Sequence, residues 1–366
     1  MTKVVLSGYY GFTNSGDEAM LAAIIHDLRV IDPAVAVTVI SGHPADTEDR
    51  HKVKAIYRLD MIEIVRAISR SDLLISGGGS LLQDVTSDRS LYYYLSIILL
   101  AKTLGKRVML YGQGIGPLAG DLARRVTRHI LNLTDLITVR DKGSLDELEA
   151  LGVIRPAIEL TADPVLSMEP ADKAAGRTIL EENGLMPGSP VVGFFVREWQ
   201  DLDYYKQVLA VVADRLVTEY GVRILFVPMQ QQDVAAAEKV AVLMQQPAVV
   251  MGQSCPVSQM LSLVGNLDML IGIRLHALIF AAVMHVPLLG VSYDPKISRF
   301  LESLGEPSPP DLHTVSAENL LARIGKMWSV RKEINRARES CMAELRSKAF
   351  RNAQLAMQLA RRQGRE

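Results

Sequence analysis

Apolar runs of strand length alternate along the chain with longer segments whose apolar side chains recur at helical spacing. Residues 3–6, 35–40 and 72–75 are runs of the first kind. Residues 20–28 place apolar side chains at i, i+1, i+4, i+5 and i+8, which is typical of a helix packed on one face. Regular alternation of strands and helices predicts parallel β-α-β units and a doubly wound sheet.

The same alternation continues to residue 291. Further strands are expected at 107–111, 136–139, 191–196, 222–228, 248–251, 269–273 and 287–291. Helices are expected at 60–69, 91–104, 121–133, 144–151, 204–220, 234–244, 256–264 and 275–284. Both halves of the chain are therefore predicted to be α/β, each with a Rossmann-like sheet.

A chain of 366 residues favours two domains. We expect an N-terminal α/β domain over 1–168 and a C-terminal α/β domain over 191–330. The segment 169–190 holds three prolines and several charges, so it is the predicted linker. Residues 331–366 form a helical tail with ten Lys or Arg against four Glu. The favoured interpretation is a helix that packs back on the domains, and the alternative is attraction to an anionic membrane surface.

Composition narrows the class of protein. Forty basic residues nearly balance 41 acidic ones, and aromatic residues make up only 5%, so nucleic acid is not an expected partner. Cys255 and Cys341 lack metal-ligand spacing and favour a reducing compartment. The chain begins without a signal-peptide pattern. We expect a cytoplasmic protein without a bound metal.

The clearest candidate site follows the strands at 269–273 and 287–291. Ligands in open parallel sheets bind beyond the carboxyl ends of the strands. Arg274 and His276 follow the first of these strands, and Tyr293 and Lys296 follow the second. A helix N-terminus beside an arginine and a histidine favours a phosphate or a carboxylate.

Glycine-rich turns follow three strands of the first half. They are GYYGFTNSGDE at 8–18, SGGGS at 76–80 and GQGIGP at 112–117. Glycine allows a backbone to approach a ligand closely, but each turn can equally be a tight connection to the next element. The spacing is not that of a dinucleotide site. The candidate binding residues on and beside these turns are Asn14, Gly16, Asp17, Gly78, Gly79, Gln83, Asp84 and Gln113.

Taken together, these stretches resemble the polysaccharide pyruvyl transferase family. The matching stretches are GYYGFTNSGDEAML (8–21), SGGGSLLQD (76–84), YGQGIGPL (111–118), TVRD (138–141), ADPV (162–165) and GIRLHALIFA (272–281). Their order and spread along the chain make the resemblance more specific than any single glycine turn. The bacterial CsaB type is the most similar.

The resemblance implies a two-domain fold similar to GT-B glycosyltransferases. It also implies transfer of pyruvate from phosphoenolpyruvate onto a sugar as a cyclic ketal, with no cofactor. In the CsaB type the acceptor is N-acetylmannosamine in a lipid-linked disaccharide, a precursor of the cell-wall polymer that anchors surface-layer proteins. The implied location is the cytoplasm, with a further hypothesis of peripheral contact at the inner face of the plasma membrane.

The candidate residues suit this chemistry. Phosphoenolpyruvate carries a phosphate and a carboxylate, which need fixed cations, and Arg140, Arg274 and Lys296 all follow predicted strands. Ketal formation needs an acid and a base, and His276 is the best-placed candidate for either role, or for phosphate binding. We therefore assign Arg140, His276 and Lys296 to catalysis. Arg274, Arg197 and Tyr293 are assigned to substrate binding.

Two other functions fit the same residues. A nucleotide-sugar glycosyltransferase or epimerase of similar fold would bind a nucleoside diphosphate. A non-catalytic protein that senses glycan precursors would bind donor or acceptor without turnover. The carboxylates Asp17 and Asp84 can orient acceptor hydroxyls or simply cap helices.

Overall fold

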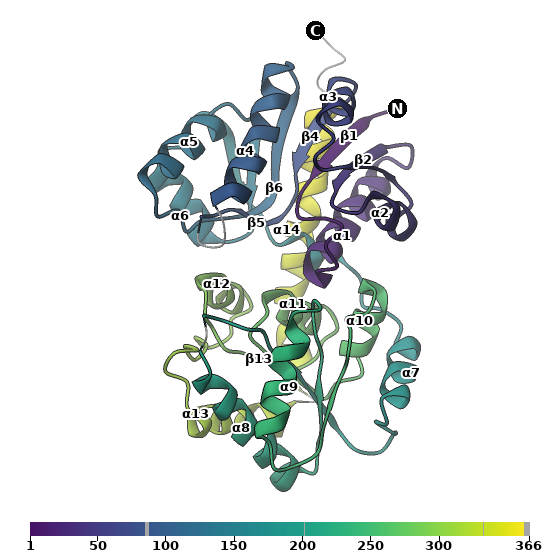
Figure 1. Cartoon of the computed structure of the whole chain (residues 1–366), viewed down its shortest axis with the longest axis vertical. Helices are drawn as coiled ribbons and strands as arrows, with labels where there is room; N and C mark the ends of the chain where they lie inside the picture. The colour runs from purple at the N-terminus through teal and green to yellow at the C-terminus, as the bar shows by residue number, and fades with distance from the viewer. Residues whose placement is uncertain (85–87, 201, 332, 362–366) are drawn as a thin grey trace. The chain divides into compact units, whose positions relative to one another are not determined.

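The computed structural model describes residues 1–84, 88–200, 202–331 and 333–361. These residues form two compact units, which Figure 1 draws with their elements labelled. Unit 1 comprises Met1–Met168 and Glu344–Glu366, and unit 2 comprises Glu169–Ala343. The predicted boundary at residue 168 coincides with this division.

The sheet of unit 1 is entirely parallel. Its strand order is β3-β2-β1-β4-β6-β7-β8, and β5 pairs with β6 beside this path. The strands are β1 (Lys3–Ser7), β2 (Ala36–Ser41), β3 (Lys54–Tyr57), β4 (Leu73–Ser76), β5 (Gly79–Leu82), β6 (Arg107–Ile115), β7 (Leu136–Val139) and β8 (Ala157–Leu160). Because the chain starts in the middle of the sheet and winds outward both ways, the sheet is doubly wound, as the alternation predicts.

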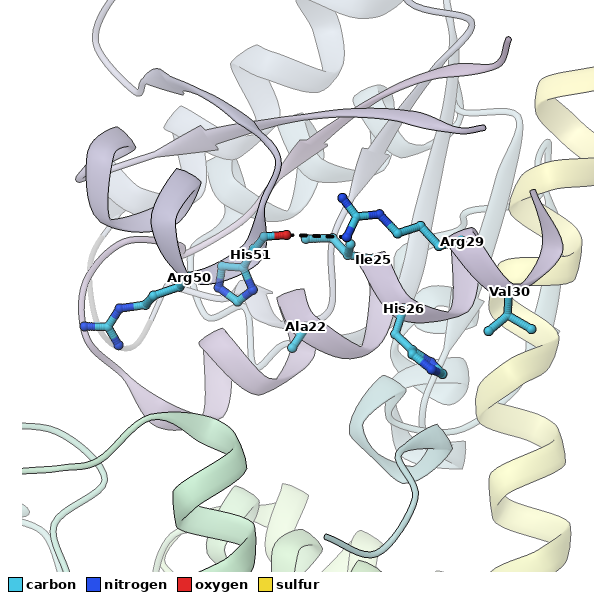
Figure 2. A pocket seen from close by; sticks show the side chains of 7 residues that line it. All are labelled: Ala22, Ile25, His26, Arg29, Val30, Arg50 and His51. Carbon is cyan, nitrogen blue, oxygen red and sulfur yellow. Dashed lines mark hydrogen bonds between the residues drawn. The ribbon is translucent and has the colours of Figure 1, made fainter. Parts of the chain in front are cut away.

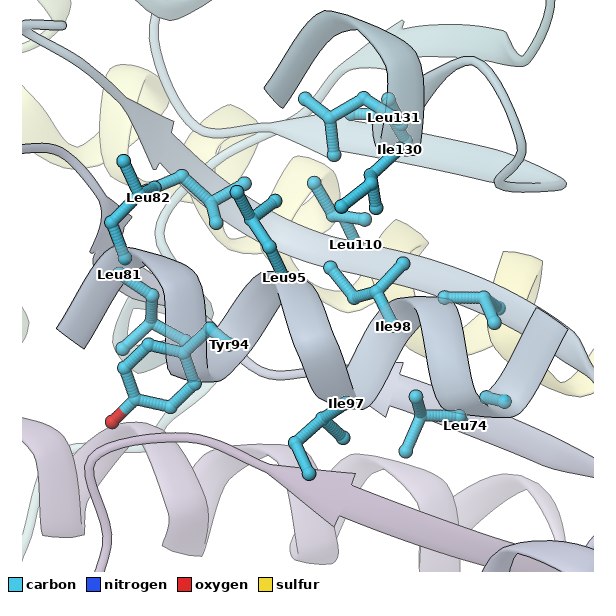
Figure 3. Close-up of a cluster of buried hydrophobic side chains, with 14 of the residues drawn as sticks. Leu74, Leu81, Leu82, Tyr94, Leu95, Ile97, Ile98, Leu110, Ile130 and Leu131 are labelled. Carbon is cyan, nitrogen blue, oxygen red and sulfur yellow. The ribbon is translucent and has the colours of Figure 1, made fainter. Parts of the chain in front are cut away.

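Helices cover both faces of this sheet. They are α1 (Ser15–Ile31), α2 (Pro44–His51), α3 (Met61–Ser69), α4 (Asp88–Thr103), α5 (Asp121–Leu131), α6 (Lys142–Leu151) and the end of α14 (Ile334–Arg361), with a short 3-10 helix, η1 (Pro164–Ser167). Apolar residues of α3, α4, α5 and α6 share one core, and residues of α1 and α14 share the other. In Figure 3, Leu95 and Ile98 of α4 face Leu110 of β6. Burial of these aliphatic faces is the main favourable term holding the layers together.

Unit 2 has a five-stranded parallel sheet in the order β11-β10-β9-β12-β13. The strands are β9 (Val191–Phe195), β10 (Arg223–Phe226), β11 (Ala248–Val250), β12 (Met269–Gly272) and β13 (Leu288–Gly290). The helices are α7 (Ala174–Glu182), α8 (Tyr204–Tyr220), α9 (Asp233–Leu243), α10 (Val257–Val264), α11 (Leu275–Val283), α12 (Pro295–Ser303) and α13 (Ala317–Val330). Side chains of α8, α9 and α13 pack on β9, β10 and β12 in one core. The α/β fold class with parallel sheets is thus confirmed.

Two glycine turns are shorter than the sequence indicates. The strand expected at 107–111 continues to Ile115 because a bulge between Leu110 and Gln113 restores its pairing with β7. Gly112 takes φ +55° at this bulge and donates its N–H to Thr138 Oγ1 at 2.8 Å. Likewise β5 begins at Gly79, inside the expected turn. Backbone pairing between distant segments caused both differences, and local sequence does not reveal it.

The segment expected as a linker, 169–190, lies within unit 2. Its helix α7 packs against α10, where the N–H of Gly176 donates to Ser262 Oγ at 2.7 Å. A Cβ at Gly176 would lie 2.2 Å from the Ser262 carbonyl oxygen. A glycine permits this close helix contact, so the composition that suggested a linker belongs partly to a packed interface.

The tail, expected to be helical over 331–366, forms α14, which is 28 residues long. Its residues from Glu344 onward belong to unit 1, where Ala353, Ala356 and Met357 are buried in the core beside α1. Asn352 accepts a hydrogen bond from Thr161 Oγ1 at 2.8 Å. The apolar side of the tail is therefore used within unit 1. Lys332 and residues 362–366 of the tail lie outside the described residues.

Candidate active site

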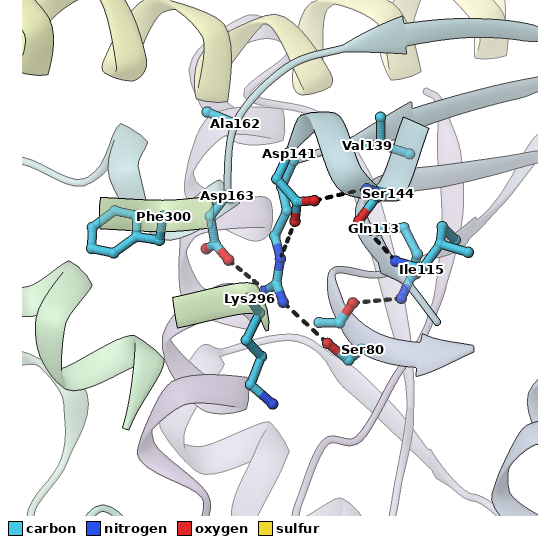
Figure 4. Close-up of polar contacts among 12 residues, drawn as sticks. Ser80, Gln113, Ile115, Val139, Asp141, Ser144, Ala162, Asp163, Lys296 and Phe300 are labelled. Atoms are coloured by element: carbon cyan, nitrogen blue, oxygen red, sulfur yellow. Dashed lines mark hydrogen bonds and ion pairs between the residues drawn. The ribbon is translucent and has the colours of Figure 1, made fainter. Parts of the chain in front are cut away.

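In unit 1, a buried arginine ties together the turns at the carboxyl ends of the strands. Arg140, directly after β7, donates from Nη1 to Asp163 Oδ2 at 2.8 Å and from Nη2 to Ser80 Oγ at 3.1 Å. Its Nε lies 3.7 Å from Asp141 Oδ2. A Cβ at Gly114 would lie 2.8 Å from Arg140 Nη2, so glycine is required beneath the guanidinium. Figure 4 shows Asp141, Asp163 and Ser80 of this network, in which two carboxylates lie beside one cation.

The SGGGS turn rests on a buried tyrosine. A Cβ at Gly77 would lie 1.9 Å from Tyr10 Oη, which leaves no room for any other residue. Gly79 has φ +101°, and its carbonyl accepts a hydrogen bond from Gln113 Nε2 at 2.6 Å. Burial, with Asp17 nearby, raises the pKa of Tyr10 well above its ordinary value, so the phenol stays neutral. The structure thus brings Gly79 and Gln113 together, and the sequence alone does not show that these residues are in contact.

Several predicted binding residues of unit 1 hold turns in place. Asn14 caps α1, its Oδ1 accepting from the N–H groups of Gly16 at 3.0 Å and Asp17 at 3.4 Å. Asp84 Oδ2 accepts from the N–H groups of Ala119 and Gly120, at 2.8 and 2.9 Å, just before α5. The other Asp84 oxygen is buried without a partner among the described residues. The capping interpretation of Asn14 and Asp84 therefore holds for these oxygens.

Two further candidates of unit 1 occupy less distinctive places. Gln83 follows β5 directly and is half-buried, and Gly78 lies in the turn between β4 and β5. A Cβ at Gly78 would lie 3.0 Å from Met20 Sδ, so this glycine serves close packing at least in part.

In unit 2, the carboxyl end of β12 carries a buried ion pair. Arg274, the N-cap residue of α11, donates from Nη2 to Asp233 Oδ1, and Asp233 Oδ2 accepts the N–H of Met229 at 3.1 Å. Burial lowers the pKa of Arg274, while Asp233 opposes this shift. Arginine remains charged under such a shift. Arg274 Nε is buried without a partner among the described residues, so one donor of this cation is not used within them.

A second group of cations surrounds an aromatic pair. Arg197 Nη1 donates to Tyr293 Oη at 2.5 Å, and its guanidinium carbon lies 4.8 Å from the Tyr293 ring centre and 5.2 Å from that of Trp199. Lys296 Nζ lies 5.3 Å from the same tyrosine ring and 3.0 Å from Asp294 Oδ2. The structure thus brings Arg197, Tyr293 and Lys296 together, although they come from two separate strand ends.

His276 lies in the first turn of α11 and is half-buried. The helix starts at Leu275, so His276 stands where backbone N–H groups lack helical partners. Two residues before it, Arg274 supplies the fixed charge described above. This neighbourhood suits a bound anion.

Two residues of this site were not found from the sequence. Asp233 reads as the first residue of a helix after a polar turn, and its pairing with Arg274 spans 41 positions. Trp199, whose ring centre lies 4.4 Å from that of Tyr293, has a buried Nε1 without a partner among the described residues. Since tryptophan is rare in this chain, with two in 366 residues, it is the one signal that could have drawn attention to position 199.

Two pockets among the described residues lie elsewhere. One of about 390 Å³ opens between α1 and α2, and Figure 2 shows Arg29 donating to the backbone carbonyl of His51 on its wall. Another, of about 480 Å³, lies beside β13, α12 and α13. Neither pocket is lined by a residue singled out from the sequence. The described residues contain no group of three or more His, Cys, Asp or Glu side chains placed to hold a metal ion.

The same fold occurs in known two-domain proteins. A putative UDP-N-acetylglucosamine 2-epimerase from Listeria monocytogenes matches with a TM-score of 0.67 and 12% identity, over 98% of this chain and 95% of that one. The UDP-GlcNAc 2-epimerase of Neisseria meningitidis matches at 0.63 and 10%, over 98% and 99%. ADP-heptose LPS heptosyltransferase II of E. coli matches at 0.55 and 13%, over 91% and 100%. The chain therefore has the GT-B class of fold, with two Rossmann-like domains.

The sequence places the chain more narrowly within that class. No curated protein matches it. The profile of the polysaccharide pyruvyl transferase family, however, matches residues 14–295. The chain belongs to the polysaccharide pyruvyl transferase family and is a transferase enzyme.

Proposed function

We propose that this enzyme transfers pyruvate from phosphoenolpyruvate onto two hydroxyls of a sugar, forming a cyclic ketal. Family membership supports polysaccharide pyruvylation in general. The observation that supports the donor is the excess of cations in unit 2, where Arg197, Arg274 and Lys296 face two carboxylates. A small molecule with a phosphate and a carboxylate matches such a site.

The donor is assigned to unit 2. Arg274 Nε has no partner among the described residues, and the N-terminus of α11, with His276 in its first turn, follows Arg274 directly. Arg197 and Lys296 both lie beside the Tyr293 ring, at 4.8 and 5.3 Å from its centre, and are assigned to the anionic groups of the donor. Tyr293 and Trp199 supply an apolar wall for the methylene group of the enol.

The acceptor is assigned to unit 1, where acidic and glycine-rich turns predominate. The unpartnered oxygen of Asp84, together with Asp17 and the backbone at Gly78 and Gly79, can accept hydrogen bonds from sugar hydroxyls. Gln113 Oε1 is likewise buried without a partner among the described residues. A polyhydroxyl ligand suits these acceptors better than an anion does.

The proposed reaction has four steps. The methylene carbon of phosphoenolpyruvate is protonated, and a first sugar hydroxyl attacks the adjacent carbon and loses its proton. The carbon–oxygen bond to phosphate then breaks, with phosphate leaving as the anion. A second hydroxyl attacks the same carbon and loses its proton, which closes the ketal. His276 is assigned the transfer of one of these protons, because a positioned imidazole can both donate and accept near neutral pH.

Arg140 takes a different place in this scheme. Its guanidinium is engaged by Asp163 and Ser80 and lies against Gly114, so its donors are largely used within the protein. We therefore move Arg140 from the catalytic set to a positioning role for the turns that would hold the acceptor.

The particular acceptor is proposed from the resemblance to the CsaB type. It is N-acetylmannosamine in a lipid-linked disaccharide, used for a cell-wall polymer that anchors surface-layer proteins. The proposed location is the cytoplasm at the inner face of the plasma membrane. No helix within the described residues is long and apolar enough to cross a membrane.

A nucleotide-sugar glycosyltransferase or epimerase is the second candidate. The two epimerases described above are named for UDP-N-acetylglucosamine, and Trp199 and Tyr293 offer rings against which a base could stack. A glycan-precursor binding protein without turnover is the third.

Phosphate release from phosphoenolpyruvate, with and without the lipid-linked disaccharide, tests the proposal. The expected result is acceptor-dependent release with a pyruvate-sized mass gain on the glycan. Release of a nucleoside diphosphate from a sugar nucleotide would favour the second candidate instead. Saturable binding of donor or acceptor without any turnover would favour the third.

A further inference from the structure

Unit 1 exposes an unusual number of large apolar side chains along one part of its surface. They lie at the end of β3, on α3 and on α4, and we call them the α3–α4 patch: Tyr57, Leu59, Met61, Ile62, Val65, Tyr92 and Leu99. Leu59 is 60% exposed and Ile62 is 66% exposed. Single exposed apolar residues are ordinary on protein surfaces, but a contiguous group marks a binding surface.

Packing between the two helices makes the patch contiguous. Helix α3 contacts α4, and Tyr93 in the first half of α4 donates its hydroxyl to the Arg58 carbonyl at 2.9 Å. The guanidinium of Arg58 also lies over the Tyr93 ring, 5.1 Å from its centre. The turn before α3 is thereby held against α4 beside Tyr92. Leu99, seven residues further, lies on the same side of α4 as Tyr92.

The core of unit 1 does not account for these side chains. Helix α3 already buries Ile64 and Ile68 completely in the core. Met61, Ile62 and Val65 occupy the side that a surface helix ordinarily gives to polar residues. The exposed side of α3 therefore carries apolar side chains beside the Glu63–Arg66 pair, which suits an amphipathic partner.

Basic residues accompany the patch and indicate the charge of that partner. Lys54, Arg70 and Arg89 are exposed on or beside the same elements. The nearby carboxylates are engaged locally, since Asp60 caps α3 and Glu63 pairs with Arg66. Exposed apolar side chains among exposed cations match an anionic lipid surface, in which the first enter the acyl boundary and the second meet headgroups.

We propose that the α3–α4 patch docks this enzyme on an anionic lipid bilayer. The proposal rests on the proposed function in one respect, namely that the acceptor is lipid-linked. Arg58 connects the two sites, because its guanidinium lies 5.3 Å from the ring centre of Phe12 in the turn after β1. Docking through α3 and α4 would bring that acceptor turn to the membrane. The basic tail is a poorer anchor, because its apolar residues are buried in unit 1.

Vesicle sedimentation of the full chain tests this proposal. The probes are vesicles of phosphatidylcholine alone and vesicles that contain about one-third phosphatidylglycerol. Binding is expected to the anionic vesicles, to fall at least about tenfold in Met61→Glu/Ile62→Glu, and to weaken with salt. The matched control is Val242→Glu/Leu243→Glu on α9, where the two side chains are 84% and 48% exposed. This control should bind within about twofold of wild type.

A second variant separates a loss of vesicle binding from a loss of the fold. Ile62→Trp should fold as wild type by circular dichroism and should show a blue-shifted emission only with anionic vesicles. Equal vesicle binding by Met61→Glu/Ile62→Glu and wild type would overturn the proposal. So would an unshifted Ile62→Trp spectrum, or a dimer in solution that the double variant abolishes, which would make a second copy the partner.

Turnover separates this inference from the proposed function. With a water-soluble acceptor, Met61→Glu/Ile62→Glu should keep wild-type turnover, and with acceptor in vesicles it should lose most of it. Vesicle binding without turnover in wild type would contradict the proposed function and leave the docking surface supported. Turnover without vesicle binding would support the proposed function and contradict the docking surface.

Discussion

The two units have parallel sheets of the same kind, but the carboxyl ends of their strands differ in charge. In unit 1 the buried cation Arg140 pairs with Asp163 and lies close to Asp141, both in turns of the protein itself. In unit 2 Arg197 donates to the hydroxyl of Tyr293, and Arg274 Nε has no partner among the described residues. The buried arginine of unit 1 is engaged by turns of the protein, whereas the arginines of unit 2 are the ones proposed to bind the donor.

This difference shows how one topology supports two kinds of site. A parallel sheet determines where ligands bind, because strand ends and helix N-termini meet at one edge. The residues in the turns then determine what binds there. Carboxylates and glycines in unit 1 suit hydroxyls, whereas guanidinium groups and a helix N-terminus in unit 2 suit anions.

Removal of His276 is expected to have the largest effect on the proposed site of unit 2. His276→Ala should lower turnover by about 10²- to 10⁴-fold, because a positioned acid or base contributes that much. Acceptor-dependent phosphate release measures the effect, and circular dichroism checks the fold. The matched control is His313→Ala, an exposed histidine of unit 2, which should keep normal turnover. Near-normal turnover of His276→Ala would remove this residue from the reaction.

A substitution of Arg140 tests whether this arginine stabilises the turns of unit 1. Arg140→Met leaves the buried carboxylate of Asp163 without its cation, so the free energy of unfolding should fall by about 3–5 kcal/mol. Urea unfolding measures this loss. The double variant Arg140→Met/Asp163→Asn should recover part of it, since no buried charge remains. Stability equal to wild type in Arg140→Met, together with a raised KM for phosphoenolpyruvate, would place Arg140 in the donor site.

A substitution of Lys296 tests whether the cations of unit 2 bind the donor. Lys296→Ala should raise the KM for phosphoenolpyruvate by about tenfold, as expected for one partly exposed charge-assisted contact. Steady-state kinetics with varied donor measure this change. Arg223→Ala, at the amino end of β10, is the matched control because it removes an exposed cation from the opposite end of the sheet. An unchanged donor response in Lys296→Ala would place the lysine outside the site.

Two carboxylates, one in each unit, are expected to change the stability of the protein with pH in opposite directions. Burial raises the pKa of Asp27 in unit 1, so its contribution to stability is present below pH 3.8 and is lost as pH rises through the raised pKa. Burial alone would also raise the pKa of Glu198 in unit 2, but Lys206 and Lys239 outweigh it and lower the pKa. Its stabilising contribution is therefore present above pH 4.5 and lost as pH falls through the lowered pKa.

Thermal unfolding of matched amide variants measures these opposite signs. At pH 7.5, Asp27→Asn should raise Tm by about 2 °C and Glu198→Gln should lower it by about 1 °C. Both differences should shrink toward pH 4. Equal signs for the two variants at pH 7.5 would contradict the assigned causes.

Periodicity alone was enough to predict the α/β class, because strand and helix repeats are local properties of the chain. The turns after β1, β4, β7 and β12 were also located in this way, and with them Asn14, Gly79, Arg140 and Arg274. Short elements such as α2 and β8 were not predicted, since few apolar residues and no strong stop signals mark them. The 169–190 segment shows the same limit, because proline and charge do not distinguish a linker from a packed helix.

The sequence by itself therefore determined the α/β class, the family, and several of the places where polar residues follow strands. Only the tertiary structure decided which of those residues act alone and which are paired. Arg140 and Arg274 look alike in the sequence, yet Asp163 and Ser80 engage one while Asp233 leaves an unpartnered donor on the other. Such pairing depends on contacts between segments more than twenty residues apart, and chain order does not encode those contacts locally.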